Sequence, residues 1–171
     1  HQQRDLSSAG SPCRAIRSPL RSVVFLGLLV ALLVLMFLFP AAALAEEPFR
    51  MGSQIEDRVG AIGGREDQVR EALDELASSE QVQLWVTYVD TFSGLGAQDW
   101  ADETAIRSDL GLSDVLLAVA VKDRAYSYSV DRDFPLDSGE LATVMNVAVE
   151  PALIENDWAG AAIGAAGGMG Q

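Results

Sequence analysis

The sequence is poor in the side chains that most often carry enzyme chemistry. Its 171 residues contain one cysteine and one histidine, Cys13 and His1, and both lie before position 46. The remaining 126 residues have no thiol or imidazole, which excludes disulfides, cysteine-rich zinc sites, cysteine nucleophiles and any Ser-His-Asp triad from that region. Positive charge is also scarce there. The 24 acidic and 8 basic side chains give a formal charge of −16, which argues against binding to nucleic acid or anionic lipid.

The first 45 residues have the composition of an export signal. Residues 14–21 carry three arginines and no acidic residue, residues 23–39 form an uninterrupted apolar run, and Ala43-Leu44-Ala45 has the small-x-small pattern that signal peptidase accepts. We expect cleavage after Ala45. An uncleaved N-terminal membrane anchor is the alternative, because the run is only slightly shorter than the ~20 residues of a spanning helix. In both cases the arginines stay in the cytoplasm, so we expect a secreted or membrane-attached protein whose acidic domain is extracytoplasmic.

Hydrophobic periodicity divides residues 46–166, enough for one domain, into alternating helices and strands. The expected helices are 66–80, 97–110, 141–154 and an Ala/Gly-rich segment at 158–166. The expected strands are 81–89, 115–121, 125–130 and a short one at 59–62, within a lead-in loop from 46 to 64. Residues 167–171 are expected to begin a glycine-rich linker.

The order of these segments predicts the fold class. A strand, a helix and the fully apolar strand at 115–121 imply a parallel pair of strands. The strand at 125–130 follows after a short turn at residues 122–124, so it adds an antiparallel neighbour. Helices must cover both faces of such a sheet. We therefore expect an α/β fold, an α/β/α sandwich around a small mixed β-sheet.

Four segments, taken in order, resemble the TPM domain. This family includes thylakoid-lumen proteins, a photosystem II repair factor, a nematode acetylcholine-receptor auxiliary protein and many bacterial members. The matching segments are residues 55–60 (IEDRVG), 81–87 (QVQLWVT), 113–120 (SDVLLAVA) and 151–161 (PALIENDWAGA). The third departs from the family pattern, because Ser113-Asp114 stands where the family has Asp or Asn followed by Gly. The resemblance implies an α/β/α fold, membrane-associated or extracytoplasmic placement, calcium-like divalent cation binding in some members, and phosphatase activity as attributed to plant members.

Carboxylates are the only strong metal ligands in the acidic domain, and they suit hard cations such as Ca²⁺. Asp114 and Asp131 flank the predicted hairpin, which brings them to the same open end. Asp57 joins them as a third metal ligand only if residues 58–64 are extended. If those residues curl, Asp57 lies beside Asp90 instead and no three-acid site forms. The alternative for all three aspartates is a structural role as turn or cap residues.

These observations leave a favoured function and two alternatives. The favoured one is a non-enzymatic, extracytoplasmic binding or auxiliary module that acts through membrane or envelope proteins. It would bind Ca²⁺ or another divalent cation through the three aspartates, and attach to the membrane by its N-terminal segment or by a region beyond residue 171.

The first alternative is a metal-dependent acid phosphatase like the plant members, with a metal-bound water as nucleophile. Against it, only Lys122, Arg124 and Arg132 lie near the hairpin to hold a phosphate. The other alternative is a sensor or stalk domain whose active partner lies beyond residue 171.

Overall fold

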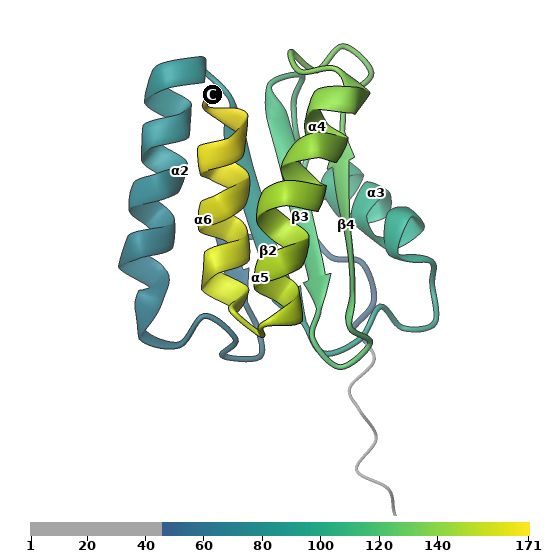
Figure 1. Cartoon of the computed structure of the whole chain (residues 1–171). Coiled ribbons are helices and arrows are strands. Elements are labelled where there is room, and N and C mark those ends of the chain that lie inside the picture. Colours follow the sequence, from purple (N-terminus) through teal and green to yellow (C-terminus); the bar gives the residue numbers. More distant parts are fainter. Residues whose placement is uncertain (1–45) are drawn as a thin grey trace, which may run out of the picture. The chain divides into compact units, whose positions relative to one another are not determined.

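A computed structural model describes residues 46–171 of the protein (Figure 1). The predicted export segment, its cleavage position and the alternative membrane anchor lie outside the described residues. Within residues 46–171, no helix combines the length and the apolar character that crossing a bilayer requires.

Four strands form one mixed sheet in the order β1-β2-β3-β4. The strands are β1 (Ile55–Asp57), β2 (Gln83–Val89), β3 (Asp114–Ala120) and β4 (Ala125–Val130). β2 runs parallel to both β1 and β3, whereas β4 is antiparallel to β3 and forms one edge of the sheet. The predicted parallel pair and the predicted hairpin are therefore confirmed.

The first strand lies earlier in the chain than predicted. β1 pairs with β2 from Ile55, which is opposite Val86, whereas residues 59–62 form a bent segment and not a strand. The apolar side chains that suggested a strand there still serve the core, because Ile62 is buried in it and Val59 packs against it. A loop residue can bury an apolar side chain as well as a strand residue, so composition alone did not separate the two cases.

Helices cover both faces of the sheet. They are the 3₁₀ turn η1 (Gly63–Arg65), α2 (Glu66–Glu80), α3 (Ala97–Arg107), α4 (Ser138–Val144), the π-helical turn η2 (Met145–Val149), α5 (Glu150–Ile154) and α6 (Trp158–Met169). α2, α6 and the α4–α5 segment lie on one face, and α3 lies on the other (Figure 1). The predicted α/β/α sandwich is confirmed. α6 continues through Gly167 and Gly168 to a buried Met169, so these residues are not the linker that we expected.

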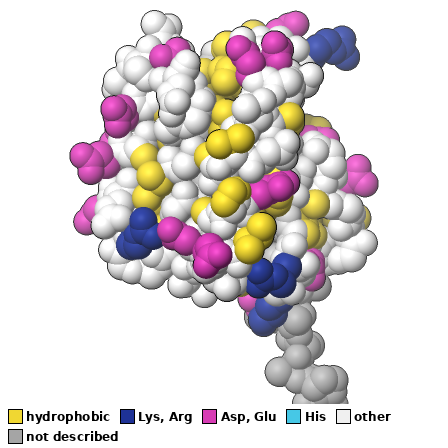
Figure 2. Space-filling model, in the orientation of Figure 1, with side chains coloured by type: hydrophobic (Ala, Val, Ile, Leu, Met, Phe, Trp, Pro, Cys, Tyr) yellow, Lys and Arg dark blue, Asp and Glu magenta, His cyan; other side chains and the backbone are white. Residues whose placement is uncertain are grey.

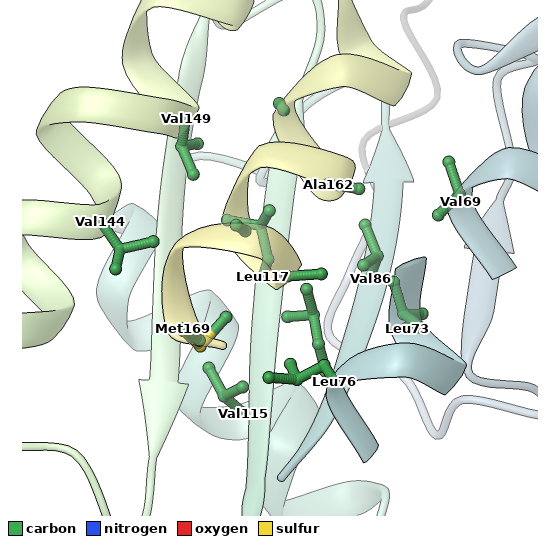
Figure 3. Close-up of a cluster of buried hydrophobic side chains, with 14 of the residues drawn as sticks. Val69, Leu73, Leu76, Val86, Val115, Leu117, Val144, Val149, Ala162 and Met169 are labelled. Atoms are coloured by element: carbon green, nitrogen blue, oxygen red, sulfur yellow. The ribbon is translucent and has the colours of Figure 1, made fainter. Parts of the chain in front are cut away.

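Each face of the sheet buries its own group of hydrophobic side chains. On the α2–α6 face, Val115 and Leu117 of β3 point toward Leu76 of α2 (Figure 3). On the opposite face, Phe92 packs against Trp100 of α3 with ring centroids 5.0 Å apart. Because β3 is covered on both sides, its sequence is apolar throughout and does not alternate.

The predicted helix at 141–154 begins earlier and is not uniform. Asp137 caps its start by accepting hydrogen bonds from the N–H groups of Gly139 and Glu140, in a complete capping box. The chain then widens into the π turn η2, in which the N–H of Glu150 donates to the C=O of Met145. Pro151 has no N–H, and its ring would collide with the preceding turn of a regular helix. The π turn relieves that collision and separates α5 from α4.

Candidate functional site

Asp57 ends β1 at the carboxyl edge of the parallel strands, where open α/β sheets commonly bind ligands. Its Oδ1 accepts hydrogen bonds from the N–H groups of Val59 at 3.2 Å and Ala61 at 2.9 Å. Its Oδ2 accepts one from the N–H of Ile62 at 3.0 Å. Both carboxylate oxygens therefore hold the bent segment after β1, which is the capping role that we weighed against metal binding.

The three aspartates predicted as metal ligands are not brought together. The strand register places Asp57 opposite Tyr88, whereas Asp114 is opposite Gln83 at the other end of β2. That separation along the strand is roughly 17 Å at ~3.3 Å per residue. Asp57 lies instead at the end of β2 that leads to Asp90, as expected if the segment after it curls. In the part of the chain that the structure describes, no group of three or more His, Cys, Asp or Glu is arranged to hold a metal ion.

The remaining polar groups at the carboxyl edge bind one another. The buried hydroxyl of Tyr88 donates to the backbone C=O of Trp158 at 2.5 Å, and Arg65 forms an ion pair with Asp157 at 2.6 Å. Burial raises the pKa of Tyr88 far above its ordinary value, and the negative charges of Asp57 and Asp157 raise it further, while Arg65 acts in the opposite direction. Tyr88 is therefore a neutral hydrogen-bond donor that fastens α6 to the sheet.

The neighbouring loops at this edge are tied together in the same way. Lys122, in the turn between β3 and β4, forms an ion pair with Asp90 at 2.6 Å. Asp123 of the same turn accepts a hydrogen bond from the N–H of Phe92 at 2.8 Å. The position at which an α/β sheet would usually receive a ligand is thus occupied by contacts within the chain.

The opposite end of the sheet does bring two of the predicted residues together. Val115 pairs with Val130, so Asp114 and Asp131 lie at the same end of the hairpin, as predicted. Both line a concavity of about 350 Å³ together with Asp102 of α3. Sequence reasoning missed Asp102, because its place at the concavity depends on how α3 packs across β4.

Each of these three carboxylates already accepts a hydrogen bond from within the chain. Asp114 accepts one from the N–H of Gly111 at 2.6 Å, and Asp131 accepts one from the N–H of Asp133 at 2.9 Å. Asp102 accepts one from the hydroxyl of Ser129 at 2.6 Å. Asp114 and Asp131 are therefore turn residues here, and the set of ligands predicted from the sequence does not fit a metal ion as it stands.

A second hollow, of about 210 Å³, lies beside β4 on the face that α5 covers. Its lining comes from β3, β4, the turn between them, α5 and α6: Val119, Arg124, Ala125, Tyr126, Glu150, Leu153, Ile154 and Trp158. The hydroxyl of Tyr126 donates to Glu150 at 2.8 Å, and Arg124 donates to the side-chain oxygen of Asn156 at 2.9 Å. No pattern in the sequence indicates this hollow, because it forms where α5 docks beside the end of the hairpin.

Comparison with known proteins confirms the family resemblance. The family model of the TPM domain matches residues 55–171. Two Mycobacterium tuberculosis proteins, UPF0603 protein Rv2345 of strain H37Rv and UPF0603 protein MT2410 of strain CDC 1551, are each 37% identical to this chain over 155 residues. The matched region is 89% of this chain but only 23% of each relative, so the chain spans about a quarter of their length.

Two solved structures share the fold. The solution NMR structure of the N-terminal domain of the cg2496 protein from Corynebacterium glutamicum has a TM-score of 0.61 and 27% sequence identity, over 76% of this chain and 86% of that one. The N-terminal domain of a protein from P. gingivalis has a TM-score of 0.59 and 17% identity, over 76% of this chain and 85% of that one. Because its sequence identity is low, the P. gingivalis structure supports the fold assignment alone.

Proposed function

The chain belongs to the TPM domain family, and we propose that it is a non-enzymatic, extracytoplasmic binding module that acts by contact with membrane or envelope proteins. One contrast carries the proposal. The carboxyl edge of the sheet, where Asp57 binds three backbone N–H groups, is filled by bonds within the chain. The surface beside β4, by comparison, has an apolar hollow that opens to solvent. Such a molecule is better suited to surface contacts than to holding a small substrate at the usual α/β position.

The surface supports this function in a second way. Large apolar side chains are exposed on three separate elements, including Ile106 of α3, Val147 of η2 and Ile154 of α5. On the face shown in Figure 2, hydrophobic side chains reach the surface at several separate places, and acidic side chains lie between and around them. Apolar surface with a polar surround is typical of protein contact sites.

Photo-crosslinking in cells tests the proposal. A photoreactive amino acid is placed, one position at a time, at Ile106, Val147 and Ile154 of the full-length protein, and at Glu71 on the outer side of α2 as the control. We expect at least one apolar position to give a discrete adduct with an envelope protein that Glu71 does not give. If none of the three does so, a module that works by contact is the wrong description.

An enzyme assay tests the non-enzymatic part separately. The purified protein is given a phosphomonoester with millimolar Ca²⁺ or Mg²⁺. We expect no hydrolysis above the rate in buffer. Turnover that rises with protein concentration and disappears in Asp114→Ala would establish the phosphatase alternative in its place.

Cation binding is a further part of the proposal, with a revised set of residues. Asp102, Asp114 and Asp131 line one concavity, but within residues 46–171 they are not arranged as a ready three-ligand group, and each uses one oxygen in an internal hydrogen bond. A Ca²⁺ ion there would have to compete with those bonds, so we expect weak binding, in the ~10⁻⁴–10⁻³ M range of extracellular calcium modules. In an amide NMR titration with Ca²⁺, the resonances of Gly111 and Asp133 should move while those of Ala61 stay still. Movement at Ala61 alone, or at none of these amides, contradicts the revised set.

A further inference from the structure

The backbone of β4 is open along its outer side. The N–H of Val121 donates to the C=O of Val89, so the odd-numbered residues of the β3 segment direct their backbone groups toward β2. The even-numbered residues of β3 therefore bond to β4, and they pair with its odd-numbered residues. It follows that Tyr126 and Tyr128 direct their N–H and C=O groups away from the sheet.

A neighbouring side chain confirms this direction and limits the open stretch. Gln98 of α3 donates from its Nε2 to the C=O of Tyr128 at 3.1 Å, which places that carbonyl on the outer side. Within residues 46–171 this leaves the N–H and C=O of Tyr126 and the N–H of Tyr128 without a partner at the start of β4, and the backbone groups of Val130 at its end. The groups at the start of β4 can pair with about three residues of an added strand.

The open stretch begins beside the hollow next to β4. Tyr126 belongs both to the open edge and to the lining of the hollow, whose apolar wall includes Leu153 and Ile154. Ile154 is 68% exposed, although it is one of the most apolar residue types. The volume of about 210 Å³ is below the ~300–1,000 Å³ of small-molecule sites. The hollow therefore suits a single apolar side chain rather than a whole ligand.

Arg124 places a positive charge beside the hollow, and this charge favours an anionic ligand. It lines the hollow next to the start of β4 and is exposed, and among the described ion pairs none involves it. Its one hydrogen bond to another side chain is to the neutral Asn156. Glu150, on the α5 side of the same hollow, supplies the opposite charge. The hollow therefore has a positive group near the first residue of β4 and a negative group beside Tyr126.

We propose that this place binds the free carboxyl terminus of an extended partner peptide, which adds to β4 as an antiparallel strand. The proposal rests on the function proposed above and names its contact site. The terminal carboxylate pairs with Arg124, the last side chain is apolar and fills the hollow, and a basic residue upstream faces Glu150. The direction follows from the charges: a peptide that ends at Arg124 must run opposite to β4, which starts there. Main-chain pairing supplies affinity in this mode, and the hollow and the charges supply specificity.

A fluorescein-labelled peptide with the sequence Ser-Lys-Arg-Thr-Val-Leu and a free carboxylate is the probe, and the same peptide with an amidated terminus is its control. Fluorescence anisotropy with the purified protein should show saturable binding that weakens at least tenfold on amidation. Arg124→Gln should weaken binding of the free acid at least tenfold. Arg132→Gln should leave it within twofold, since Arg132 is an exposed arginine beyond the other end of β4. Ile154→Asp should also weaken binding at least tenfold.

Amide NMR reports whether the peptide adds as a strand. The N–H resonances of Tyr126 and Tyr128 should shift on binding, and those of α2 should not. The spectra also show that each variant is folded, so that lost binding is not lost structure. No saturable binding at 1 mM peptide, or equal binding of acid and amide, overturns the proposal.

Two other occupants would give different results. A second copy of the chain would make the Tyr126 and Tyr128 resonances depend on protein concentration without any peptide. A small amphiphilic carboxylate, tested as decanoate, would displace the peptide and shift the residues of the hollow but not the Tyr128 amide. Either outcome overturns the peptide proposal. If the peptide fails to bind while crosslinks form from Ile106 or Val147, the binding module stands and only this site is wrong.

Discussion

Asp57→Asn should destabilise the protein in the absence of any metal ion. The Asp57 carboxylate accepts N–H groups from Val59, Ala61 and Ile62 at 2.9–3.2 Å. An asparagine can keep its carbonyl oxygen toward Val59 and Ala61, but its NH₂ then faces the N–H of Ile62, and that bond is lost. A hydrogen bond to a charged group contributes about 1.5–3 kcal/mol. We expect the free energy of unfolding to fall by about 2 kcal/mol for Asp57→Asn. For Asp57→Ala we expect a fall of about 4 kcal/mol, roughly 2 for each carboxylate oxygen lost, since Val59 and Ala61 share Oδ1.

Urea unfolding followed by tryptophan fluorescence, in buffer with EDTA, measures this effect. Asp74→Asn is the matched control, because Asp74 is exposed on α2 and its carboxylate makes no hydrogen bond within residues 46–171. We expect the control to stay within about 0.5 kcal/mol of the wild type, as is usual for surface substitutions. The same series is then repeated with 5 mM Ca²⁺ in place of EDTA, and the difference between Asp57→Asn and wild type should not change.

The result that refutes the reasoning is specific. If Asp57 were a metal ligand, its substitution would change the free energy of unfolding little when no metal is bound. The same substitution would abolish the stabilisation that the ion gives to the wild type. If Asp57→Asn unfolds like the wild type in EDTA, and Ca²⁺ stabilises only the wild type, then Asp57 is a ligand and the cap is incidental.

Three further substitutions test the packing of α6. Tyr88→Phe should cost about 1–2 kcal/mol at pH 7, because it removes the hydrogen bond that the buried Tyr88 hydroxyl donates to the C=O of Trp158. The raised pKa of Tyr88 means that its contribution is complete below about pH 10 and is lost as the pH rises further. Urea midpoints at pH 7 and 11 should therefore fall less steeply in the variant than in the wild type; an equal fall contradicts the assignment. Gly164→Ala should cost about 1–3 kcal/mol, because a Cβ would lie 2.9 Å from the backbone oxygen of Ala148. Gly167→Ala, with nothing within 4 Å of the new Cβ, should be neutral or stabilising by up to about 1 kcal/mol, and equal costs at both glycines would contradict this packing.

Much of the fold could be predicted because it is encoded in local patterns. The helix α2 spans residues 66–80 as expected, since Val69, Leu73 and Leu76 recur at helical spacing and all three are buried. β3 was predictable from its continuous apolar sequence, which a strand covered on both faces requires. The parallel and antiparallel pairings then followed from the connections between the strands.

The candidate site was less predictable, because it depends on contacts between distant segments. The position of Asp57 relative to Asp114 depends on whether the segment after β1 is extended or bent. The composition of that segment does not distinguish an extended from a bent conformation. Asp57 itself decides the matter, since its carboxylate gathers three N–H groups that an extended segment would direct elsewhere. The contribution of Asp102 to the concavity depends on how α3 packs against β4, which no local pattern specifies.

The departure from the family pattern before β3 has a structural explanation. The resemblance implies a glycine next to the V-L-L segment, whereas this chain has Asp114 there, and a turn that begins at Gly111 leads into β3. The N–H of Asp114 donates to the C=O of Gly111 at 3.1 Å, and the Asp114 carboxylate accepts from the N–H of Gly111 at 2.6 Å. A carboxylate oxygen is therefore used to hold this turn. This is why we expect only weak cation binding at this end of the sheet.

The open edge of β4 is the feature that a binding function explains best. An unpaired strand edge promotes aggregation, and proteins usually shorten, charge or cover such edges. Here Gln98 covers only the C=O of Tyr128 and leaves Tyr126 open beside an exposed Ile154. The formal charge of −16 over residues 46–171 opposes pairing between two copies of the chain. The exception is Arg124 beside the start of the edge, a cation that forms no ion pair within residues 46–171 and favours an anionic chain end. The net negative charge of the domain thus disfavours self-association. At the start of β4, however, Arg124 favours the binding of a different chain that presents a carboxylate.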